Sequence, residues 1–352
     1  MPDHPEGFTQ SKHDYSLFIR DAKEGVTLVL VYVDDLLITG SDASFATLLK
    51  RVLDEAFTIK DLGQIKYFLG LEVNRTEAGI FLSQHKYISD ILKDTGMENA
   101  KPAPFPLPKG LHLSVDEGEL LLEPEVYRRL IGRMLYLNLT RPDLSYVVQH
   151  LSQFLSAPRE PHMQAAKHVV RYLKGTARAT LFYSAQTDLQ LRAYCDADWG
   201  SCQFSCRSLT GHCVFLGKSV VSWKTKKQRT VSKSSAESEY RSMSYTAGEV
   251  VWLIGILQDF QVQVQLPVQL NCDNKAAQHI AANPVFHERT KHLNIDCHYV
   301  REKIQEGLLR TEYVRSDQQL ADLMTKPLGH DQHFFLSSKL GLLFEPSQAN
   351  PS

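Results

Sequence analysis

The pattern of apolar and polar positions divides the chain into three sections, the first two separated by a connecting loop. Residues 15–90 hold short β-branched, aromatic or alternating runs punctuated by Gly and Asp, which predict strands and turns with one or two helices. Residues 101–124 are rich in Pro and Gly and predict a connecting loop. Residues 186–328 begin with three strand-like runs, after which helical and strand-like patterns alternate. That order predicts a mixed sheet with helices on its faces.

Apolar residues recur at helical spacing between the loop and the last section. The stripes consist of Leu130, Ile131, Met134 and Leu135, then Leu144, Val147, Val148, Leu151 and Leu155, and then Ala166, Val169, Val170 and Leu173. Gly175 is a typical helix stop, and prolines separate the three patterns. This section therefore predicts a small helical bundle.

Composition narrows the class of protein without deciding its function. The formal net charge is −1, so only local charge can point to a polyanionic partner. The longest apolar run is interrupted by two acids, which argues against a membrane span. Six cysteines in 352 residues are too few for a disulfide framework and favour a reducing compartment. Cys202, Cys206, His212 and Cys213 lie close in sequence, but their spacing matches no closed zinc site, and free, partly buried thiols are favoured.

Two adjacent acids, Asp34 and Asp35, stand in the apolar stretch LVLVYVDDLLITG. The flanking runs predict a hairpin with these two acids in its turn, a position that Asp tolerates well. Turn residues in solvent are one interpretation. The other is a divalent cation, which would relieve the repulsion between neighbouring carboxylates and serve phosphoryl transfer.

The segment around this hairpin resembles a known family. YVDD, with GFTQSKHDYSLFI before it and IKYFLGLEV after it, resembles the reverse transcriptase of copia-class LTR retrotransposons. YRRLIGRMLYLNLTRPDLSYVVQHLSQFLSAP and AAKHVVRYLKGT resemble that family's stretch between polymerase and ribonuclease H. The resemblance covers nearly the whole chain, so we expect a fragment of a copia-class Pol polyprotein.

The resemblance implies a multi-domain α/β and α+β fold. Residues 1–100 would be a partial reverse-transcriptase palm with the YVDD hairpin, and residues 101–180 a helical thumb or connection. Residues 186–330 would be a ribonuclease H-like domain with a mixed five-stranded sheet flanked by helices, and residues 331–352 a loosely ordered tail. Such polymerases need a third carboxylate on an earlier strand, and Asp3, Asp14 and Asp21 match no such motif. We therefore expect Asp34 and Asp35 to be the remnant of a polymerase motif and the chain alone to lack polymerase activity.

Ribonuclease H chemistry needs four carboxylates, and the resemblance assigns the first two with local alternatives. Asp196 and Asp198 both follow the strand LQLRAYC; the resemblance favours Asp196, with Asp198 in the turn. The long helix offers Glu237 and Glu239. Glu237 fits a capping box, whereas Glu239 continues the apolar line of the helix that should face the sheet. Glu239 is therefore the candidate, although an exposed helix acid remains the ordinary alternative.

The third and fourth acids come from the later elements. Asp273 closes a strand and opens a helix, where it is either an N-cap, a role that Asn274 also fits, or part of a site at the strand end. Asp296 and Asp322 compete for the fourth position. Asp322 follows the last strand and lies in QLADLMTKPL, which resembles the family's closing motif, so it is favoured. The resemblance implies two Mg²⁺ ions, or Mn²⁺, held by Asp196, Glu239, Asp273 and Asp322.

A basic segment precedes the helix that carries Glu239. WKTKKQRTVSK places five cations beside the expected metal site, namely Lys224, Lys226, Lys227, Arg229 and Lys233. Such a run is ordinarily a solvated basic loop. The functional interpretation is that it contacts the phosphates of a nucleic acid. Lys167, Arg171 and Lys174 form a second basic helix face with the same two readings.

These observations lead to three functional hypotheses. The first is a Mg²⁺-dependent ribonuclease H that cuts the RNA of an RNA–DNA hybrid, joined to a truncated reverse transcriptase. The second is a catalytically inactive nucleic-acid-binding remnant, and the third an unrelated metal phosphohydrolase of similar topology. The resemblance implies an intracellular location, in cytoplasmic virus-like particles or in the nucleus, no membrane, and other parts of the retrotransposon polyprotein as possible partners.

Overall fold

The computed structural model describes residues 7–202, 204–282 and 294–344, with the side chains of residues 294–297 left aside. These residues divide into two compact units. The first comprises residues 1–65 and 248–266, and the second residues 66–247 and 267–352. Each unit is considered by itself. None of the helices within the described ranges has the length and apolar character needed to cross a bilayer.

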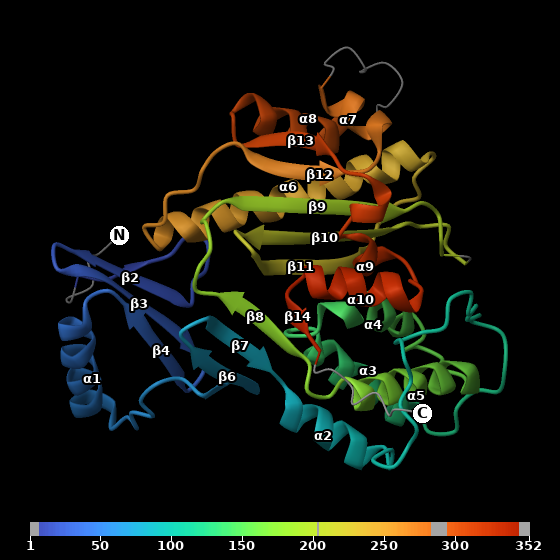
Figure 1. Ribbon diagram of the computed structural model, residues 1–352, viewed down its shortest axis with the longest axis horizontal. Helices are drawn as coiled ribbons and strands as arrows, with labels where there is room; N and C mark the ends of the chain where they lie inside the picture. Colours follow the sequence, from blue (N-terminus) through green and yellow to red (C-terminus); the bar gives the residue numbers. More distant parts are fainter. Residues whose placement is uncertain (1–6, 203, 283–293, 345–352) are drawn as a thin grey trace. The chain divides into compact units, whose positions relative to one another are not determined.

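The first unit is built on a four-stranded antiparallel sheet in the order β1-β2-β3-β4. Figure 1 shows β2, β3 and β4 of this sheet. Its strands are β1 (Thr9–Gln10), β2 (Leu17–Ala22), β3 (Gly25–Tyr32) and β4 (Asp35–Gly40), followed by helix α1 (Ala43–Phe57). Asp42 caps α1 by accepting a hydrogen bond from the Phe45 amide, 2.9 Å away. The sequence predicted β2, β3 and β4 and the hairpin between β3 and β4, but not the short strand β1.

The hairpin between β3 and β4 turns one residue earlier than the sequence predicted. Tyr32 pairs with Asp35, so Val33 and Asp34 form the turn and Asp35 begins β4. Val33 has φ = 51°, a left-handed conformation that a β-branched residue rarely adopts. Asp34 and Asp35 are both exposed. The acid pair is thus split between the turn and the strand.

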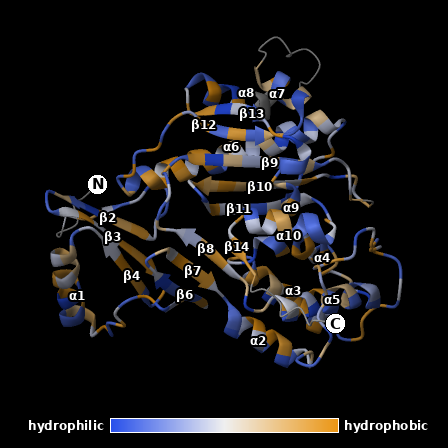
Figure 2. Ribbon diagram, viewed as in Figure 1, coloured by the Kyte–Doolittle hydropathy of each residue, from blue (hydrophilic) through white to orange (hydrophobic). Residues whose placement is uncertain are grey.

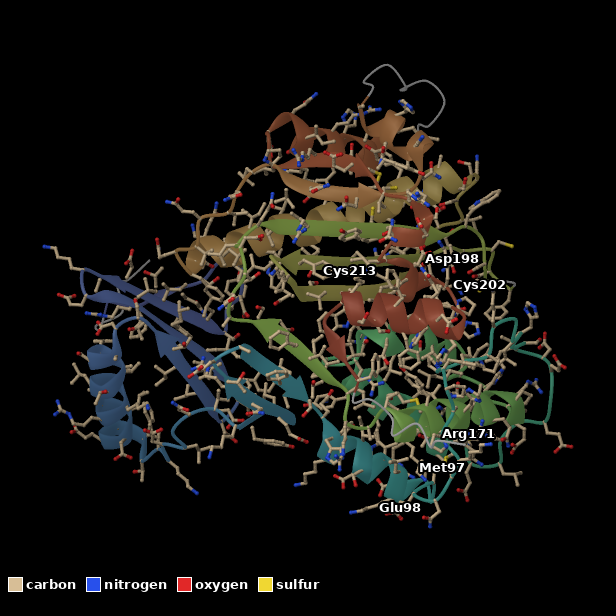
Figure 3. The ribbon with its side chains drawn as sticks, in the orientation of Figure 1. Met97, Glu98, Arg171, Asp198, Cys202 and Cys213 are labelled. Atoms are coloured by element: carbon tan, nitrogen blue, oxygen red, sulfur yellow. The ribbon has the colours of Figure 1, made fainter. Side chains whose placement is uncertain are left out.

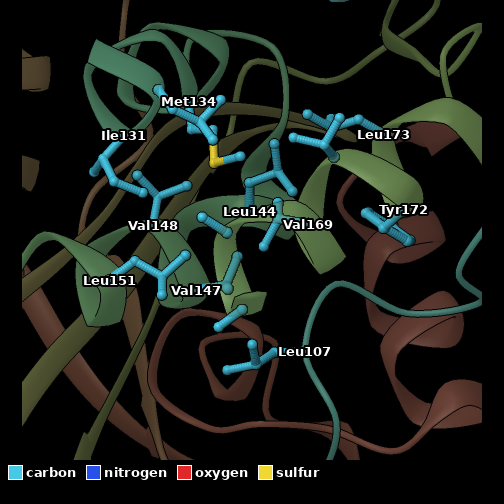
Figure 4. Close-up of a cluster of buried hydrophobic side chains, with 14 of the residues drawn as sticks. Leu107, Ile131, Met134, Leu144, Val147, Val148, Leu151, Val169, Tyr172 and Leu173 are labelled. Atoms are coloured by element: carbon cyan, nitrogen blue, oxygen red, sulfur yellow. The ribbon is translucent and has the colours of Figure 1, made fainter. Parts of the chain in front are cut away.

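A helical bundle forms an extensive hydrophobic core in the second unit. It contains α2 (His85–Asp94), α3 (Pro124–Leu137), α4 (Ser145–Ser152) and α5 (Glu160–Gly175), with the short 3-10 turn η1 (Pro142–Leu144) before α4. The side chains of Ile131, Met134, Val148 and Val169 meet in its interior (Figure 4). The predicted apolar stripes are confirmed except at Leu135, whose side chain is exposed, and at Leu155, which lies beyond the end of α4.

A buried ion pair lies inside this bundle. The Arg141 guanidinium donates two hydrogen bonds to the Asp143 carboxylate, at 2.9 and 2.7 Å. Tyr172 donates its hydroxyl to the same carboxylate at 2.6 Å, and the His333 ring lies 3.0 Å from that hydroxyl. Because every member is buried and hydrogen-bonded, the network joins η1, α5 and α10 (His330–Lys339) without leaving an unpaired charge.

A second sheet of this unit was only partly predicted. Its order is β14-β8-β7-β6-β5, and it joins β5 (Tyr67–Phe68), β6 (Leu71–Thr76) and β7 (Gly79–Ser83) to two strands from far along the chain. These are β8 (Thr180–Ser184) and β14 (Leu342–Leu343). The prediction of a loosely ordered tail from residue 331 is wrong for its described part, because Leu336, Leu340 and Leu342 are buried in a hydrophobic cluster.

The mixed five-stranded sheet of the last section has the order β11-β10-β9-β12-β13. Its strands are β9 (Leu191–Asp198), β10 (Leu209–Leu216), β11 (Ser219–Lys227), β12 (Val268–Cys272) and β13 (Leu309–Tyr313). β9, β10 and β11 are antiparallel neighbours, whereas β12 runs parallel to both β9 and β13. Figure 2 shows the alternation of hydrophobic and hydrophilic residues along β12. This is the mixed sheet that the sequence predicted.

Four helices accompany this sheet in chain order. They are α6 (Ser235–Asp259), α7 (Lys275–Ala282), α8 (Asn294–Gln305) and α9 (Asp322–Thr325), with the 3-10 turn η4 (Ser316–Gln318) before α9. α9 packs closely on β10, because a Cβ at Gly211 would lie 2.6 Å from the Met324 Cβ and from the Thr325 methyl. Glycine at this position therefore allows α9 to reach the sheet.

Candidate metal centre

Asp196 provides the centre of an acidic cluster at the end of β9. The strand runs to Asp198, so Asp196 lies inside it rather than at its end, and its side chain is almost fully buried. Asp196 is paired with Gly211 and faces α9, where Thr325 donates its hydroxyl to the carboxylate. Burial raises the pKa of Asp196, although Lys326 and the Thr325 hydroxyl oppose that rise.

Asp198 is the alternative first acid, and the structure gives it local partners. It accepts hydrogen bonds from the Ser201 hydroxyl and the Leu209 amide, and it lies in the last position of β9 rather than in the turn (Figure 3). Burial raises its pKa to about 7. These bonds tie Asp198 to the connection between β9 and β10.

Glu239 is brought to the cluster by the buried face of α6. It is 6 % exposed and stands in line with Met243 and Ala247, which are fully buried. Burial and then the negative charge of Asp196 raise its pKa to about 10. A carboxyl group so placed releases its proton readily only when a cation comes close to it.

Glu237 has the capping role that the sequence indicated. Its amide is held by the Ser234 hydroxyl at 3.2 Å, and its carboxylate accepts the Lys233 amide at 2.9 Å. It also forms an ion pair with Arg241 at 3.1 Å. The two glutamates of the helix are thus separated, one capping the helix and the other facing the cluster.

Asp273 follows β12, and its neighbour Asn274 takes the cap of α7. The Asn274 side chain accepts a hydrogen bond from the Ala277 amide at 3.0 Å. Asn274 therefore caps the helix, and the Asp273 carboxylate does not. Asp273 instead accepts a hydrogen bond from the Ser316 hydroxyl at 2.7 Å. Ligand atoms of Glu239, Cys272 and Asp273 all lie within 4.8 Å of one another.

Asp322 opens α9 and is also buried. Burial and then the charge of Asp196 raise its pKa to about 7, with a smaller contribution from Asp273. Its carboxylate forms an ion pair with Lys326 at 2.7 Å. The side chain of the competing Asp296 lies outside the described residues.

Lys326 is a site residue that the sequence reasoning missed. Its ammonium lies 3.1 Å from Asp196 and 2.7 Å from Asp322, and so connects the two carboxylates. Burial lowers the pKa of Lys326, but these two acids raise it more, so the net change is upward. The signal was present in the sequence, because Lys326 follows Asp322 at i+4 on what was predicted to be a helix.

The four predicted acids therefore come together from four elements, in two groups. Asp196 and Asp322 share Lys326, while Glu239 and Asp273 lie beside Cys272. Asp196 links the two groups, because its negative charge raises the pKa of both Glu239 and Asp322. Oxygen ligands that repel one another in a buried place suit hard divalent cations such as Mg²⁺. The donor set thus fits the metal that the resemblance implies.

The acid pair of the hairpin has different surroundings. Asp34 and Asp35 are exposed, and among the described residues no third metal-ligating side chain forms a group with them. The only such group found in those residues is Glu239, Cys272 and Asp273. The described cysteines, Cys195, Cys202, Cys206, Cys213 and Cys272, are free thiols, and the suggested zinc set around Cys202 does not form.

The basic segment before α6 is half strand and half loop. β11 extends to Lys227, so Lys224 and Lys226 project from a strand, whereas Arg229 and Lys233 follow it, and these four side chains are exposed. Lys226 lies over the Tyr245 ring, 5.0 Å from its centre. Lys227 is partly buried and bonds to Gln153 at 2.7 Å and to Cys202 at 2.8 Å. It is therefore less available to a ligand than the other four.

The second basic face is also partly engaged. Lys174 on α5 donates to the Ala100 carbonyl at 2.8 Å, and Arg171 lies 3.3 Å from the His168 ring. Lys167 is exposed. Trp223 donates its ring N–H to the Asn138 carbonyl at 3.0 Å and packs beside a hydrophobic cluster, as expected of a core residue.

Comparison with known proteins decides the family. Residues 4–109 match the family model of reverse transcriptase (RNA-dependent DNA polymerase). The chain is 42 % identical over 343 residues to the retrovirus-related Pol polyprotein from transposon RE1 of Arabidopsis thaliana, covering 97 % of this chain and 23 % of that one. It is 32 % identical to the putative transposon Ty5-1 protein of Saccharomyces cerevisiae, covering 69 % of this chain and 80 % of that one. The chain belongs to the copia-class retrotransposon Pol family.

This copia-class chain spans about a quarter of the length of the curated Pol polyproteins from transposons RE1 and RE2. It is also 32 % identical to the Pol polyprotein from transposon TNT 1-94 of Nicotiana tabacum, covering 92 % of this chain and 25 % of that one. Among solved structures, it is similar to the N-terminal RNase H domain of a Mycobacterium tuberculosis protein, with a TM-score of 0.29, 14 % identity, and coverage of 43 % of this chain and 98 % of that one.

Proposed function

We propose that the section from residue 186 to residue 330 is a ribonuclease H-like domain that cleaves the RNA strand of RNA–DNA hybrids. The observation that carries this proposal is the meeting of Asp196, Glu239, Asp273 and Asp322 at one place. They arise from a central strand, the long helix, the end of the parallel strand β12 and the closing helix. Membership of a family that copies RNA into DNA makes hybrids the expected substrate.

The proposed catalysis uses two divalent ions, Mg²⁺ or Mn²⁺, held by these four carboxylates. When bound, such a metal pair supplies an activated water and stabilises the leaving oxygen of the cleaved strand. The chain's own residues set up the site before that. Thr325 and Lys326 orient Asp196, and Ser316 orients Asp273 by its 2.7 Å hydrogen bond. The raised pKa values of Glu239 and Asp322 mean that both carboxyl groups lose their protons when cations arrive.

Nucleic-acid binding is proposed for the exposed cations before α6. Lys224, Lys226, Arg229 and Lys233 present four positive charges on exposed side chains. Contacts to phosphates position a duplex but carry no sequence information, so binding should depend on salt and on hybrid shape. We also propose that the domain acts beside other parts of a longer Pol polyprotein, since the Pol polyproteins of transposons RE1, RE2 and TNT 1-94 are about four times as long.

The experiment is cleavage of a labelled RNA–DNA hybrid by the purified chain in Mg²⁺. Asp196→Asn and Asp273→Asn should each lower the rate by at least about a hundredfold, because a ligand of the metal pair is lost. Asp331→Asn is the matched control, since Asp331 is fully exposed on α10 and pairs only with His330 in its ion pair. Cleavage that survives both site substitutions would remove the site assignment.

A catalytically inactive binding remnant is the second candidate, and Lys326 favours it. Its ammonium already neutralises part of the cluster, as a metal would, by its contacts with Asp196 and Asp322. In that case the chain would bind hybrid with the same salt dependence and cleave neither strand in Mg²⁺ or Mn²⁺. Primer extension on a poly-rA template tests the separate expectation that the chain has no polymerase activity.

A further inference from the structure

One thiol lies among the carboxylates of the proposed site. Cys272 is the last residue of β12, and its sulfur belongs to the group of ligand atoms, with Glu239 and Asp273, that lie within 4.8 Å of one another. The Cys272 Sγ is 3.8 Å from Glu239 Oε2. Mg²⁺ prefers oxygen ligands, so a Mg²⁺ site alone does not account for a thiol at this position.

Asn274 and Cys195 are hydrogen-bond partners of the Cys272 sulfur. The Asn274 amide donates to Cys272 Sγ at 3.4 Å, and the thiol of Cys195 on the neighbouring strand β9 is hydrogen-bonded to it. Both strands run in parallel, and Asn271 pairs with Tyr194, which places Cys272 directly beside Cys195. The Asn274 N–H that points at this sulfur would support it as a metal ligand, as hydrogen-bond partners of metal ligands commonly do.

We propose that Glu239, Cys272 and Asp273 bind a soft divalent ion of the Zn²⁺ class. Zn²⁺ accepts mixed sulfur and carboxylate ligands at about 2.0–2.3 Å, and three protein ligands leave its fourth position open. Binding would release the thiol proton of Cys272 to solvent. The inference rests on the proposed function in one respect, because Glu239 and Asp273 are also ligands of the proposed Mg²⁺ site. It adds that Zn²⁺ bound there displaces Mg²⁺ and inhibits cleavage of the hybrid.

The test uses Cd²⁺ alone as a spectroscopic probe of the purified full chain, without nucleic acid. A thiolate bound to Cd²⁺ gives an ultraviolet charge-transfer band, and we expect the band to saturate at one ion per chain. Cys272→Ser should abolish it. Cys213→Ser and Cys202→Ser are matched controls that should keep it, since Cys213 lies in the middle of the sheet and Cys202 beyond its end (Figure 3). A wild-type chain without the band, or a band that survives Cys272→Ser, would overturn the proposal.

Two further variants keep the test sharp if Cys272→Ser is poorly folded. Cys195→Ala removes the partner of the ligand and should weaken Cd²⁺ binding about 10- to 100-fold while the band remains. Asp273→Asn, at a partly exposed position, should also weaken binding at unchanged circular dichroism. Unchanged affinity in both variants would contradict the site. Because no substrate is present, a chain that never cleaves hybrid can still show the band, so this result and the failure of the proposed function are distinguishable.

Discussion

The ammonium of Lys326 lies 3.1 Å from an oxygen of the buried Asp196 carboxylate. The same ammonium reaches Asp322 at 2.7 Å. Lys326 is therefore an internal cation for the acidic cluster when no metal is bound, and it holds α9 against β9. Removing the positive charge of Lys326 should therefore increase the electrostatic repulsion among the four carboxylates.

Lys326→Gln should destabilise the metal-free protein by about 1 kcal/mol, a modest value because the Lys326 side chain is 37 % exposed. Saturating Mg²⁺ should remove most of that loss, because the ions replace the missing charge. The measurement is urea unfolding in EDTA and in Mg²⁺. Lys303→Gln is the matched control, since Lys303 pairs with Glu302 and Glu306 away from the cluster, and its effect should be the same in both conditions. An equal loss for Lys326→Gln with and without Mg²⁺ would contradict this role.

Gly211→Ala should disturb the site through α9. The new methyl group would lie 2.6 Å from Met324 and Thr325, so the helix that carries Asp322 must shift. We expect destabilisation of about 1–3 kcal/mol and a loss of hybrid cleavage. Gly132→Ala on α3 is the contrasting variant, because nothing lies within 4 Å of its added methyl, and it should stabilise the chain by about 0.5–1 kcal/mol. Normal cleavage by Gly211→Ala would show that the position of α9 is unimportant.

The buried Arg141–Asp143 pair should be the most sensitive point of the helical bundle. Asp143→Ala leaves the Arg141 charge buried without its partner and should cost about 3–5 kcal/mol. Tyr172→Phe removes a single hydroxyl donor from the same carboxylate and should cost about 1 kcal/mol. Denaturant unfolding measures both. Similar costs for the two variants would mean that the charge pair contributes little beyond its hydrogen bonds.

Buried His333 should make the protein less stable in mild acid. Burial lowers its pKa to about 4, below the value of about 6.5 for an unfolded histidine. The unfolded chain therefore binds the proton first, and stability is lost as the pH falls from 6.5 towards 4. For this one group, the loss between pH 6.5 and pH 5 is about 1.5 kcal/mol. His333→Gln should flatten the pH dependence of unfolding by that amount, whereas His85→Gln, at an exposed position, should leave it unchanged.

Replacing Lys224, Lys226, Arg229 and Lys233 together by Gln should weaken hybrid binding and its salt dependence. Each lost phosphate contact makes the slope of log binding constant against log salt concentration less negative by about 0.9. A control with the exposed lysines 12, 23, 101 and 109 replaced has the same change in net charge and should keep the slope. The measurement is binding at several KCl concentrations with Mg²⁺ omitted. Equal slopes for the two variants would assign the contacts to other residues.

The sequence predicted most regular elements because their patterns are local. The alternation in β12, the stripes of α3 and α5 and the cap at Glu237 depend on neighbours within one element. It missed β8 as the partner of β7 and β14 as the partner of β8, since strand pairing across the chain leaves no local signal in short segments. It also misplaced the hairpin turn by one residue, because the Val33 backbone adopts a conformation that its own side chain disfavours.

The same limit applies to the site. Family motifs located the four acids, and the helical spacing of apolar residues distinguished Glu239 from Glu237. The neighbours that control these acids come from elsewhere in the fold: Lys326 reaches Asp196 across the chain, and Cys272 meets Glu239 only once β12 pairs with β9. Such contacts depend on tertiary packing, which spacing along one element does not encode.

Uptake of Mn²⁺, followed by electron paramagnetic resonance of the free ion, tests the central claim most directly. If the four carboxylates act as one cluster, the chain should bind two Mn²⁺ ions, and Asp196→Asn should lower the affinity for both, since the charge of Asp196 raises the pKa of both Glu239 and Asp322. The Asp331→Asn control should bind both ions as the unmodified chain does. Absence of uptake, or uptake that is unaffected by Asp196→Asn, would contradict the account.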